Sequence, residues 1–359
     1  MKILVGMSGG VDSSTAAALL ASQGHDVTGV IMTLWREGNN LRGGDREACY
    51  GPQEVADVES ARRNCAQLGI PLQTIDCSRE YEKHIVEYFR SEYLAGRTPN
   101  PCVRCNAMIK FGLLPRLAWE AGLRFDRFAT GHYARIVDNG PASRKLLLKA
   151  ADDTKDQSYF LCRLSQEQLS RHIFPLGPLR KTEVRAIARQ FGLQASDRPD
   201  SQDFYSGDTA ELIGSDDRPG DIVDEATGKV LGHHTGYWKF TIGQRRGLGV
   251  SSSTPLYVTG IDACRNRVLL GTSEAVCHHS LTAADFNWLS IPAPQAPLAC
   301  QVKVRSVQKP VQCTLLPMGN GEYRAEFPEG INGVAPGQAA VFYSEELLLG
   351  GGTILSASR

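Results

Sequence analysis

The stretch from Gly6 to Ser13, which reads GMSGGVDS, has the residue types of a phosphate-binding turn. It follows a short apolar run and precedes an alanine-rich run, so we expect a strand, a turn and a helix in that order. Gly9 and Gly10 leave backbone amides accessible, and the helix N-terminus favours negative charge. Asp12 is placed to cap this helix or to help hold a metal ion. The turn therefore predicts a phosphate site.

This turn is not a Walker A loop, because that motif needs four residues between its glycines and a lysine after the second. The letters SGGVDS instead resemble the pyrophosphate loop of the ATP-pyrophosphatase families. Those families cleave ATP between the α and β phosphates and adenylate a substrate oxygen. An ordinary strand-to-helix turn is the alternative, but six matching residues in this context favour an ATP site.

Cys102 and Cys105 form a CxxC pair inside a proline-rich segment. A zinc site normally needs four ligands, commonly two such pairs, and no second pair exists. A purely structural role fits poorly with an exposed turn, so we favour a reactive pair. Cys105 is expected near a helix N-terminus, and three basic residues surround the pair: Arg97, Arg104 and Lys110. Both effects lower a thiol pKa.

Alternating strands and helices position these stretches. We expect strands at 3–5, 27–32, 72–75 and 127–130, and helices at 15–21, 53–68, 80–94, 108–121 and 182–191. This order indicates a parallel sheet covered on both faces, whose ligands sit at the carboxyl ends of the strands. The turns at Gly6, Met32, Cys77 and Gly131 should therefore share one edge of the sheet.

The second half of the chain has a different pattern. The chain has 359 residues, which is long enough for two or three domains. Beyond a polar stretch at 197–208 the sequence turns to short β-like runs, and 298–354 alternates as in a small β-barrel. We expect a catalytic domain over 1–205, a small central domain over 206–280 and a C-terminal barrel over 281–359.

Composition places the protein among ordinary globular chains. Hydrophobic residues make up 42% and charged residues 22%, while basic and acidic residues both number 39. Net charge therefore says nothing for or against a nucleic-acid partner. No membrane-spanning run or signal peptide is visible, so we expect a cytoplasmic location and reduced thiols. Among the ten cysteines, we assign Cys49, Cys65 and Cys77 to the core.

Seven motifs together make the resemblance specific. In order they are SGGVDSS, GRTPNPxxxCNxxIKFG, ATGHYAR, KDQSYFL, FPLG, TIGQRRGLG and PGQAAVFY. Their order is similar to that of the tRNA-specific 2-thiouridylase family (MnmA, also called TrmU), over nearly the whole chain. The resemblance implies an α/β fold: a parallel-sheet, adenine-nucleotide α-hydrolase-like (PP-loop) domain, a small central domain and a C-terminal β-barrel. The implied activity is ATP-dependent conversion of wobble uridine 34 of certain tRNAs to 2-thiouridine.

The resemblance also implies roles for individual residues. The ATP contacts are Gly6, Met7, Ser8, Gly9, Gly10, Val11, Asp12, Ser13, Gly131 and, on the adenine side, Met32. The contacts with tRNA or its target base are Asn100, Pro101, Cys102, His132, Lys155, Asp156, Gln157, Arg305, Ser306 and Gln338. Cys105 matches the nucleophile, and Asp12 and Cys102 complete the catalytic candidates. Arg245 and Arg246, with their neighbour Gln244, are further phosphate partners on physical grounds.

Two departures from the family pattern concern sulfur transfer. The family usually has Asp where this chain has Cys102. Its persulfide-bearing cysteine lies in a segment that reads DSQDFY here (200–205), and Tyr205, in the cysteine's place, cannot carry sulfur.

Sulfur transfer without the usual second cysteine can be explained in two ways. In the first, which we favour, Cys102 serves as the persulfide-bearing or resolving thiol. Alternatively, Cys102 and Cys105 ligate an iron–sulfur cluster, with Asp203 or Cys162 as a third ligand.

Partners and rival functions follow from this reading. We expect ATP with Mg²⁺, tRNA, a persulfide or sulfide donor such as a sulfur-relay protein or cysteine desulfurase, no membrane, and a monomer. One rival is an ATP-pyrophosphatase that amidates a small molecule, which predicts a glutaminase domain and no tRNA-binding barrel. The other is a degenerate relative that binds tRNA without thiolating it. This second hypothesis is supported by Tyr205, which stands where the family has a cysteine. The SGGVDS loop and Cys105 argue against it.

Overall fold

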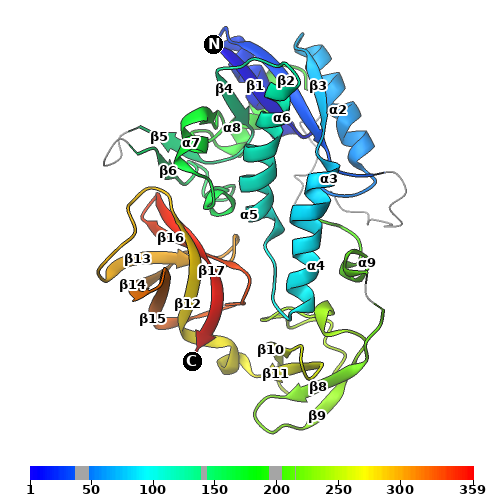
Figure 1. The fold of residues 1–359 in the computed structure, drawn as a ribbon, viewed down its shortest axis with the longest axis vertical. Helices are drawn as coiled ribbons and strands as arrows, with labels where there is room; N and C mark the ends of the chain where they lie inside the picture. The colour runs from blue at the N-terminus through cyan, green and yellow to red at the C-terminus, as the bar shows by residue number, and fades with distance from the viewer. Residues whose placement is uncertain (37–47, 139–143, 194–203, 215) are drawn as a thin grey trace.

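A computed structural model describes residues 1–36, 48–138, 144–193, 204–214 and 216–359. Three sheets organise these residues: a parallel sheet in the first part of the chain, a central sheet, and a barrel sheet that two short strands of the first part extend (Figure 1). The loop expected at 36–47 and the stretch 197–203, with Asp203, lie outside the described residues, apart from Arg36.

The first sheet has the order β3-β2-β1-β4-β7, and each neighbouring pair of strands is parallel. Its strands are β1 (Lys2–Met7), β2 (Asp26–Thr33), β3 (Leu72–Asp76), β4 (Arg127–Thr130) and β7 (His172–Ile173). On β1, Leu4 packs into a cluster with Phe111, whereas Ile3 and Val5 pack into another with Ala17. Both faces are therefore covered, and the predicted parallel α/β sheet is confirmed.

Helices of this first part follow the predicted order. They are α1 (Val11–Ser22), α2 (Glu54–Gln67), α3 (Ser78–Tyr81), α4 (Glu87–Leu94), α5 (Pro101–Cys105), α6 (Leu114–Glu120), α7 (Gln166–Arg171) and α8 (Lys181–Gln190). Two π-helical stretches, η1 (Glu82–Val86) and η2 (Asn106–Leu113), join α3 to α4 and α5 to α6 without a break. The two resulting helices run from the sheet toward the other two sheets (Figure 1).

The helix predicted at 108–121 begins earlier than expected, at Pro101. Asn100 caps it, because its Oδ1 accepts a hydrogen bond from the Val103 amide at 3.2 Å. Proline suits the first helical position, where its missing N–H costs nothing. The CxxC pair therefore lies within a helix and not on an exposed turn, which corrects the expectation.

The other two sheets occupy the second half of the chain. The central sheet, ordered β10-β11-β8-β9, contains β8 (Gly220–Asp224), β9 (Val230–His234), β10 (Tyr257–Asp262) and β11 (Arg267–Gly271). The barrel contains β12 (Cys277–Trp288), β13 (Leu298–Lys303), β14 (Val311–Gly319), β15 (Glu322–Asn332), β16 (Ala339–Ser344) and β17 (Leu347–Ser358). Short helical elements are η4 (Ser158–Leu161), α9 (Thr209–Ile213), η6 (Tyr237–Lys239) and η7 (Ser273–Val276).

Antiparallel pairing of β12 with β17 closes six strands into the predicted barrel. Two short strands that the sequence pattern does not predict, β5 (Arg135–Val137) and β6 (Leu146–Leu148), extend its sheet. Leu148 of β6 pairs with Leu347 of β17. A hairpin from the first part of the chain is thus hydrogen-bonded to the barrel. None of the helices in the described ranges is long and apolar enough for a membrane span.

His172 on β7 makes stability depend on pH. It is buried against Phe111 and Phe128, and burial lowers its pKa from 6.5 to about 4. The unfolded chain therefore binds more protons between about pH 4 and 6.5, so the free energy of unfolding falls as pH drops through that window, by up to about 3 kcal/mol. Urea unfolding at several pH values measures this slope.

The variant His172→Phe should flatten this pH dependence, because it removes the titrating group. His233→Gln is the matched control, since the His233 side chain is 75% exposed. Equal slopes in wild type and His172→Phe would contradict the assignment.

Candidate functional site

The turn after β1 has the geometry predicted for a phosphate loop. Gly9 has φ +74°, and a Cβ there would lie 2.5 Å from the carbonyl oxygen of Asp57. The Ser13 hydroxyl accepts a hydrogen bond from the Ser8 amide at 3.1 Å and donates to the Gly10 carbonyl at 3.2 Å. Gly10 precedes α1, which begins at Val11. A tight, internally bonded turn thus meets a helix N-terminus.

A pocket of about 230 Å³ lies at this turn. It is lined by most of the predicted nucleotide contacts, namely Gly6, Met7, Ser8, Gly10, Val11, Asp12, Ser13, Met32 and Gly131. Gly9 is the exception, and its backbone packs against Asp57. The same pocket is lined by His132, Lys155 and Gln157, which the resemblance had placed on tRNA, and by Cys49, Asp57, Lys110, Leu114, Phe128, Thr130 and Tyr133.

Asp12 does not cap α1. Its two carboxylate oxygens each accept a hydrogen bond from the Lys181 ammonium at 2.8 Å, and Oδ1 also accepts one from the Tyr133 hydroxyl at 2.8 Å. Lys181 is buried at the first position of α8, and Asp12 is about a quarter exposed. This pair joins α1 to α8 beside the phosphate loop. Asp12 therefore has a structural role at the loop, whether or not it also helps to bind a metal ion.

Gly131 allows β4 to approach the loop closely. A Cβ at this position would lie 2.7 Å from both the carbonyl carbon of Asp12 and the amide nitrogen of Ser13. Next to it, His132 shares a 2.8 Å hydrogen bond with Thr130. Burial, with the charge of Lys110, lowers the pKa of His132 well below its usual value, so the ring is neutral near pH 7.

The CxxC pair lies on α5, which continues into the π-helical stretch η2 that carries Lys110 of this pocket. Cys105 is buried, and Cys102 is half-buried. Burial raises the pKa of the Cys105 thiol to about 12, although the charge of Lys110 acts to lower it. The predicted lowering is therefore wrong for Cys105, because desolvation in the interior outweighs the nearby ammonium.

Two basic residues expected around the pair have other partners. Arg97 makes an ion pair with Glu92 at 2.6 Å, and Arg104 stacks on the Tyr88 ring at 4.5 Å. Lys110 is different, since it lines the phosphate-loop pocket. Burial acts to lower the pKa of Lys110, but the sulfurs of Cys49, Cys105 and Cys102 outweigh it and raise the pKa.

A second pocket, of about 540 Å³, lies between α5 and the barrel. Asn100 lines it, and so do Arg104, Arg163 and Asp285. Gln338, which is buried, donates to the Pro99 carbonyl at 2.6 Å and accepts from the Asn100 side chain at 3.3 Å. Gln338 thus holds the start of α5 on the barrel.

The remaining tRNA candidates are placed as follows. The Asp156 side chain is 5% exposed, accepts from the Ser158 hydroxyl at 2.9 Å and pairs with Lys303 at 4.0 Å. Arg305 donates to the Gly333 carbonyl at 3.2 Å, and burial lowers its pKa. Pro101 is buried at the start of α5, and Ser306 is half-buried on the turn after β13. Asp156 therefore joins the first part of the chain to the barrel, and Arg305, which also donates to the Ile242 carbonyl at 3.4 Å, joins the barrel to the central part.

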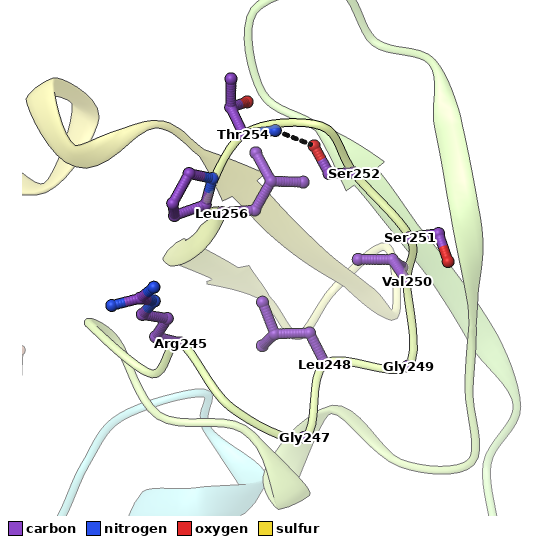
Figure 2. A pocket seen from close by; sticks show the side chains of 10 residues that line it. Arg245, Gly247, Leu248, Gly249, Val250, Ser251, Ser252, Thr254 and Leu256 are labelled. Atoms are coloured by element: carbon purple, nitrogen blue, oxygen red, sulfur yellow. Dashed lines mark hydrogen bonds between the residues drawn. The ribbon is translucent and has the colours of Figure 1, made fainter.

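The TIGQRRGLG motif forms a separate hollow beside the central sheet. It has a volume of about 400 Å³, with Arg245 on one side and Val250 and Ser251 on the other (Figure 2). The Thr254 amide donates to the Ser252 hydroxyl at 3.3 Å within its rim. A cationic group beside exposed hydroxyls and amides suits a phosphate, as the sequence suggested for Arg245.

Three residues of the site were missed or misjudged from the sequence. Cys49, assigned to the core, is exposed and lines the phosphate-loop pocket; Cys65 and Cys77 are buried as predicted. Lys181 lies 169 positions from its partner Asp12, and nothing in the local sequence marks that distant contact. For Lys110 the sequence predicts only a positive charge near the cysteines, and not its place in this pocket.

Comparisons with known proteins agree with this architecture. Residues 1–205 match the family described as the tRNA methyl transferase HUP domain. Residues 211–272 match its PRC-barrel domain, and 278–354 match the aminomethyltransferase beta-barrel domain. The tRNA-specific 2-thiouridylase MnmA of Endomicrobium trichonymphae is 46% identical over 99% of each chain. Those of Syntrophotalea carbinolica and Nostoc punctiforme are each 44% identical over 98% of each chain.

The parallel sheet, the glycine turn and its pocket define the class of PP-loop ATP-binding proteins. Because relatives above 40% identity span nearly the full length, the family follows directly. The chain belongs to the tRNA-specific 2-thiouridylase family.

Proposed function

We propose that this protein uses ATP to thiolate uridine in tRNA. ATP adenylates the C2 oxygen of the base, and sulfur carried as a cysteine persulfide replaces it, which yields 2-thiouridine, AMP and pyrophosphate. The wobble position 34 is the proposed target, as in the resemblance. One observation supports the proposal: α5 and η2 form one continuous helix that lines both pockets, with Asn100 and Arg104 at the pocket against the barrel and Lys110 at the phosphate-loop pocket, and Cys105 lies on this helix.

The proposed reaction divides between the two pockets that the α5–η2 helix lines. The glycine turn and the N-terminus of α1 would hold the ATP phosphates, with Lys110 and Lys155 supplying positive charge. Asn100 and Pro101 would meet the target base at the other pocket, with Arg305, Ser306 and Gln338 on the barrel side. Cys105 is the proposed nucleophile for sulfur. We also propose the three-domain division at 205 and 280.

Mg²⁺ would enter with the ATP phosphates, since this ion is usually held by one or two carboxylates and by phosphate oxygens. Asp12 is the carboxylate at the loop, and its oxygens already accept hydrogen bonds from Lys181. An iron–sulfur cluster fits less well. Within the described ranges no group of three or more His, Cys, Asp or Glu side chains is arranged to hold a metal.

Neither candidate for a third ligand of an iron–sulfur cluster, Cys162 or Asp203, supports the presence of such a cluster. The Cys162 thiol is fully buried, and its sulfur would lie 3.2 Å from a Cβ at Gly351 of the barrel. Asp203 lies outside the described residues. We therefore propose a persulfide route, with a donor of the cysteine-desulfurase or sulfur-relay kind, in a cytoplasmic monomer.

A direct assay tests the function. Purified protein, unmodified tRNA, ATP, Mg²⁺ and a persulfide donor should give 2-thiouridine by nucleoside mass spectrometry, with one AMP formed per thiouridine. Omission of ATP should abolish the product. If tRNA binds but no thionucleoside forms, the protein is the non-thiolating relative; if ammonia or glutamine drives AMP formation without tRNA, it is an amidating enzyme.

A further inference from the structure

The family's second catalytic cysteine, which carries the persulfide, is absent from its usual position in this chain. At the position of the family's persulfide-bearing cysteine stands Tyr205, whose hydroxyl donates to Glu211 at 2.5 Å. A phenol cannot carry a sulfane sulfur. A thiol from another segment must therefore lie near Cys105 if the proposed function, on which this inference rests, is right.

Cys49 lies on the segment next to Tyr205. The Tyr50 amide donates to the Phe204 carbonyl at 3.1 Å, and the two rings stack with centroids 6.0 Å apart and planes at 4°. The side chains of Tyr50 and Phe204 both point into the core. Cys49 therefore comes from a segment that is hydrogen-bonded to the segment of the absent cysteine.

The Cys49 thiol is exposed, in contrast to its neighbours. It lines the phosphate-loop pocket together with Lys110, Ser8 and Ser13. It is the sole cysteine among the described residues that line this pocket. A sulfur on Cys49 would thus be accessible to an external donor and face the nucleotide phosphates.

Cys49 and Cys105 lie around one buried cluster: Tyr50, next to Cys49, stacks on Tyr81 with ring centroids 5.3 Å apart, and both rings belong to the same core cluster as Cys105. The charge of Cys49 contributes to raising the pKa of Cys105, and both sulfurs act on Lys110 and on the buried Tyr81. The Lys110 ammonium is thus positioned to stabilise a thiolate or a persulfide anion on either residue.

We propose that Cys49 is the persulfide carrier of this enzyme and that Cys105 is the thiol that resolves it. Cys49 attacks the outer sulfur of a donor persulfide, R–S–SH, so that Cys49–S–SH forms and the donor thiolate leaves. The terminal sulfur then attacks C2 of the adenylated uridine and AMP leaves, which gives a Cys49–S–S–C2 adduct.

Resolution of this adduct completes the reaction. The Cys105 thiolate attacks the Cys49 sulfur, a Cys49–Cys105 disulfide forms, and the electron pair of the broken bond moves to the sulfur on C2 as the thiocarbonyl. Two thiols are oxidised while the sulfane sulfur is reduced. An external dithiol returns the two electrons before the next cycle.

Cys102 is the competing candidate. It precedes Cys105 by three residues on α5, so it lies on the same helical face and is half-buried. The exposed Cys49 is better placed for the first step, because a protein-borne persulfide must be reached from outside. Burial suits Cys105 for the later attack, since it protects the resolving thiol from the donor.

Two serine variants separate these roles. With a persulfide donor and no added thiol, Cys49→Ser should make no 2-thiouridine, yet inorganic sulfide, which displaces AMP directly, should restore the product. Cys105→Ser should instead accumulate the enzyme–tRNA disulfide adduct, and dithiothreitol should release 2-thiouridine from it. Cys264→Ser, a change at an exposed cysteine of the central part, should behave as wild type.

Disulfide mapping of wild type after one turnover provides a second measurement that needs no variant. A Cys49–Cys105 disulfide supports the proposal. A Cys102–Cys105 disulfide, full activity of Cys49→Ser with the persulfide donor, or iron and labile sulfide retained by these thiols in anaerobically purified protein would overturn it. If wild type itself makes no 2-thiouridine with either sulfur source, the proposed function fails instead.

Discussion

Replacing Cys105 with serine is expected to lower the rate of 2-thiouridine formation by at least about a thousandfold in a single turnover without added thiol. Loss of a nucleophile in other covalent enzymes costs this much or more. ATP affinity should stay close to wild type, because Cys105 is buried in α5 and the phosphate loop is held by its own hydrogen bonds. Rapid-quench nucleoside mass spectrometry and ATP titration measure the two effects.

Two controls make this result specific. Cys264→Ser changes an exposed cysteine far along the chain and should leave both quantities unchanged. Circular dichroism of Cys105→Ser should match wild type, since serine is close to cysteine in volume. A Cys105→Ser enzyme that thiolates within tenfold of the wild-type rate would refute the nucleophile assignment.

The raised pKa of Cys105 has a consequence for catalysis. A thiol with a pKa of about 12 is protonated near pH 7, so the state described by the structure is a resting one. The thiolate has to form when ATP and tRNA are bound, and Lys110 is the described cation whose charge favours it. The sequence could not reveal this, because burial depends on packing against Tyr81 and Cys77, which are distant in the chain.

Local features of the fold were predictable and distant ones were not. The turn after β1 was predicted because all its determinants lie within eight consecutive residues. Asn100 and Pro101 carry the start signal of α5, but the prolines before and after the asparagine make the sequence predict a loop there. Strands β5 and β6 have three residues each and become strands by pairing with each other and, for β6, with β17.

The same contrast applies to the site. Gly6, Met32 and Gly131 meet at one pocket because parallel strands end at one edge, which a strand pattern predicts. Cys49 was misjudged because it has no partner in its own segment, whereas the structure brings it beside 204–205. Asp12 was read as a cap because a first-turn carboxylate usually has that role, whereas a buried lysine on α8 binds it.

Replacing Lys181 with methionine is expected to lower the free energy of unfolding by about 2–3 kcal/mol. Breaking a buried ion pair typically costs 3–5 kcal/mol, and the partial exposure of Asp12 reduces this. The unpaired carboxylate should also weaken ATP binding, because it lies beside the loop that receives the phosphates. The midpoint of the urea transition and an ATP titration measure these losses.

The double variant Lys181→Met/Asp12→Asn separates the two roles of Asp12. Removing both charges should recover most of the stability, since the cost comes from the carboxylate left without its partner. If Asp12 only fixes the loop, ATP binding and thiolation recover with stability. If Asp12 also takes part in Mg²⁺–ATP chemistry, stability recovers while thiolation stays low. If the single Lys181→Met variant is as stable as wild type, the ion pair does not hold α1 to α8. In that case the carboxylate of Asp12 is not destabilised by losing its partner.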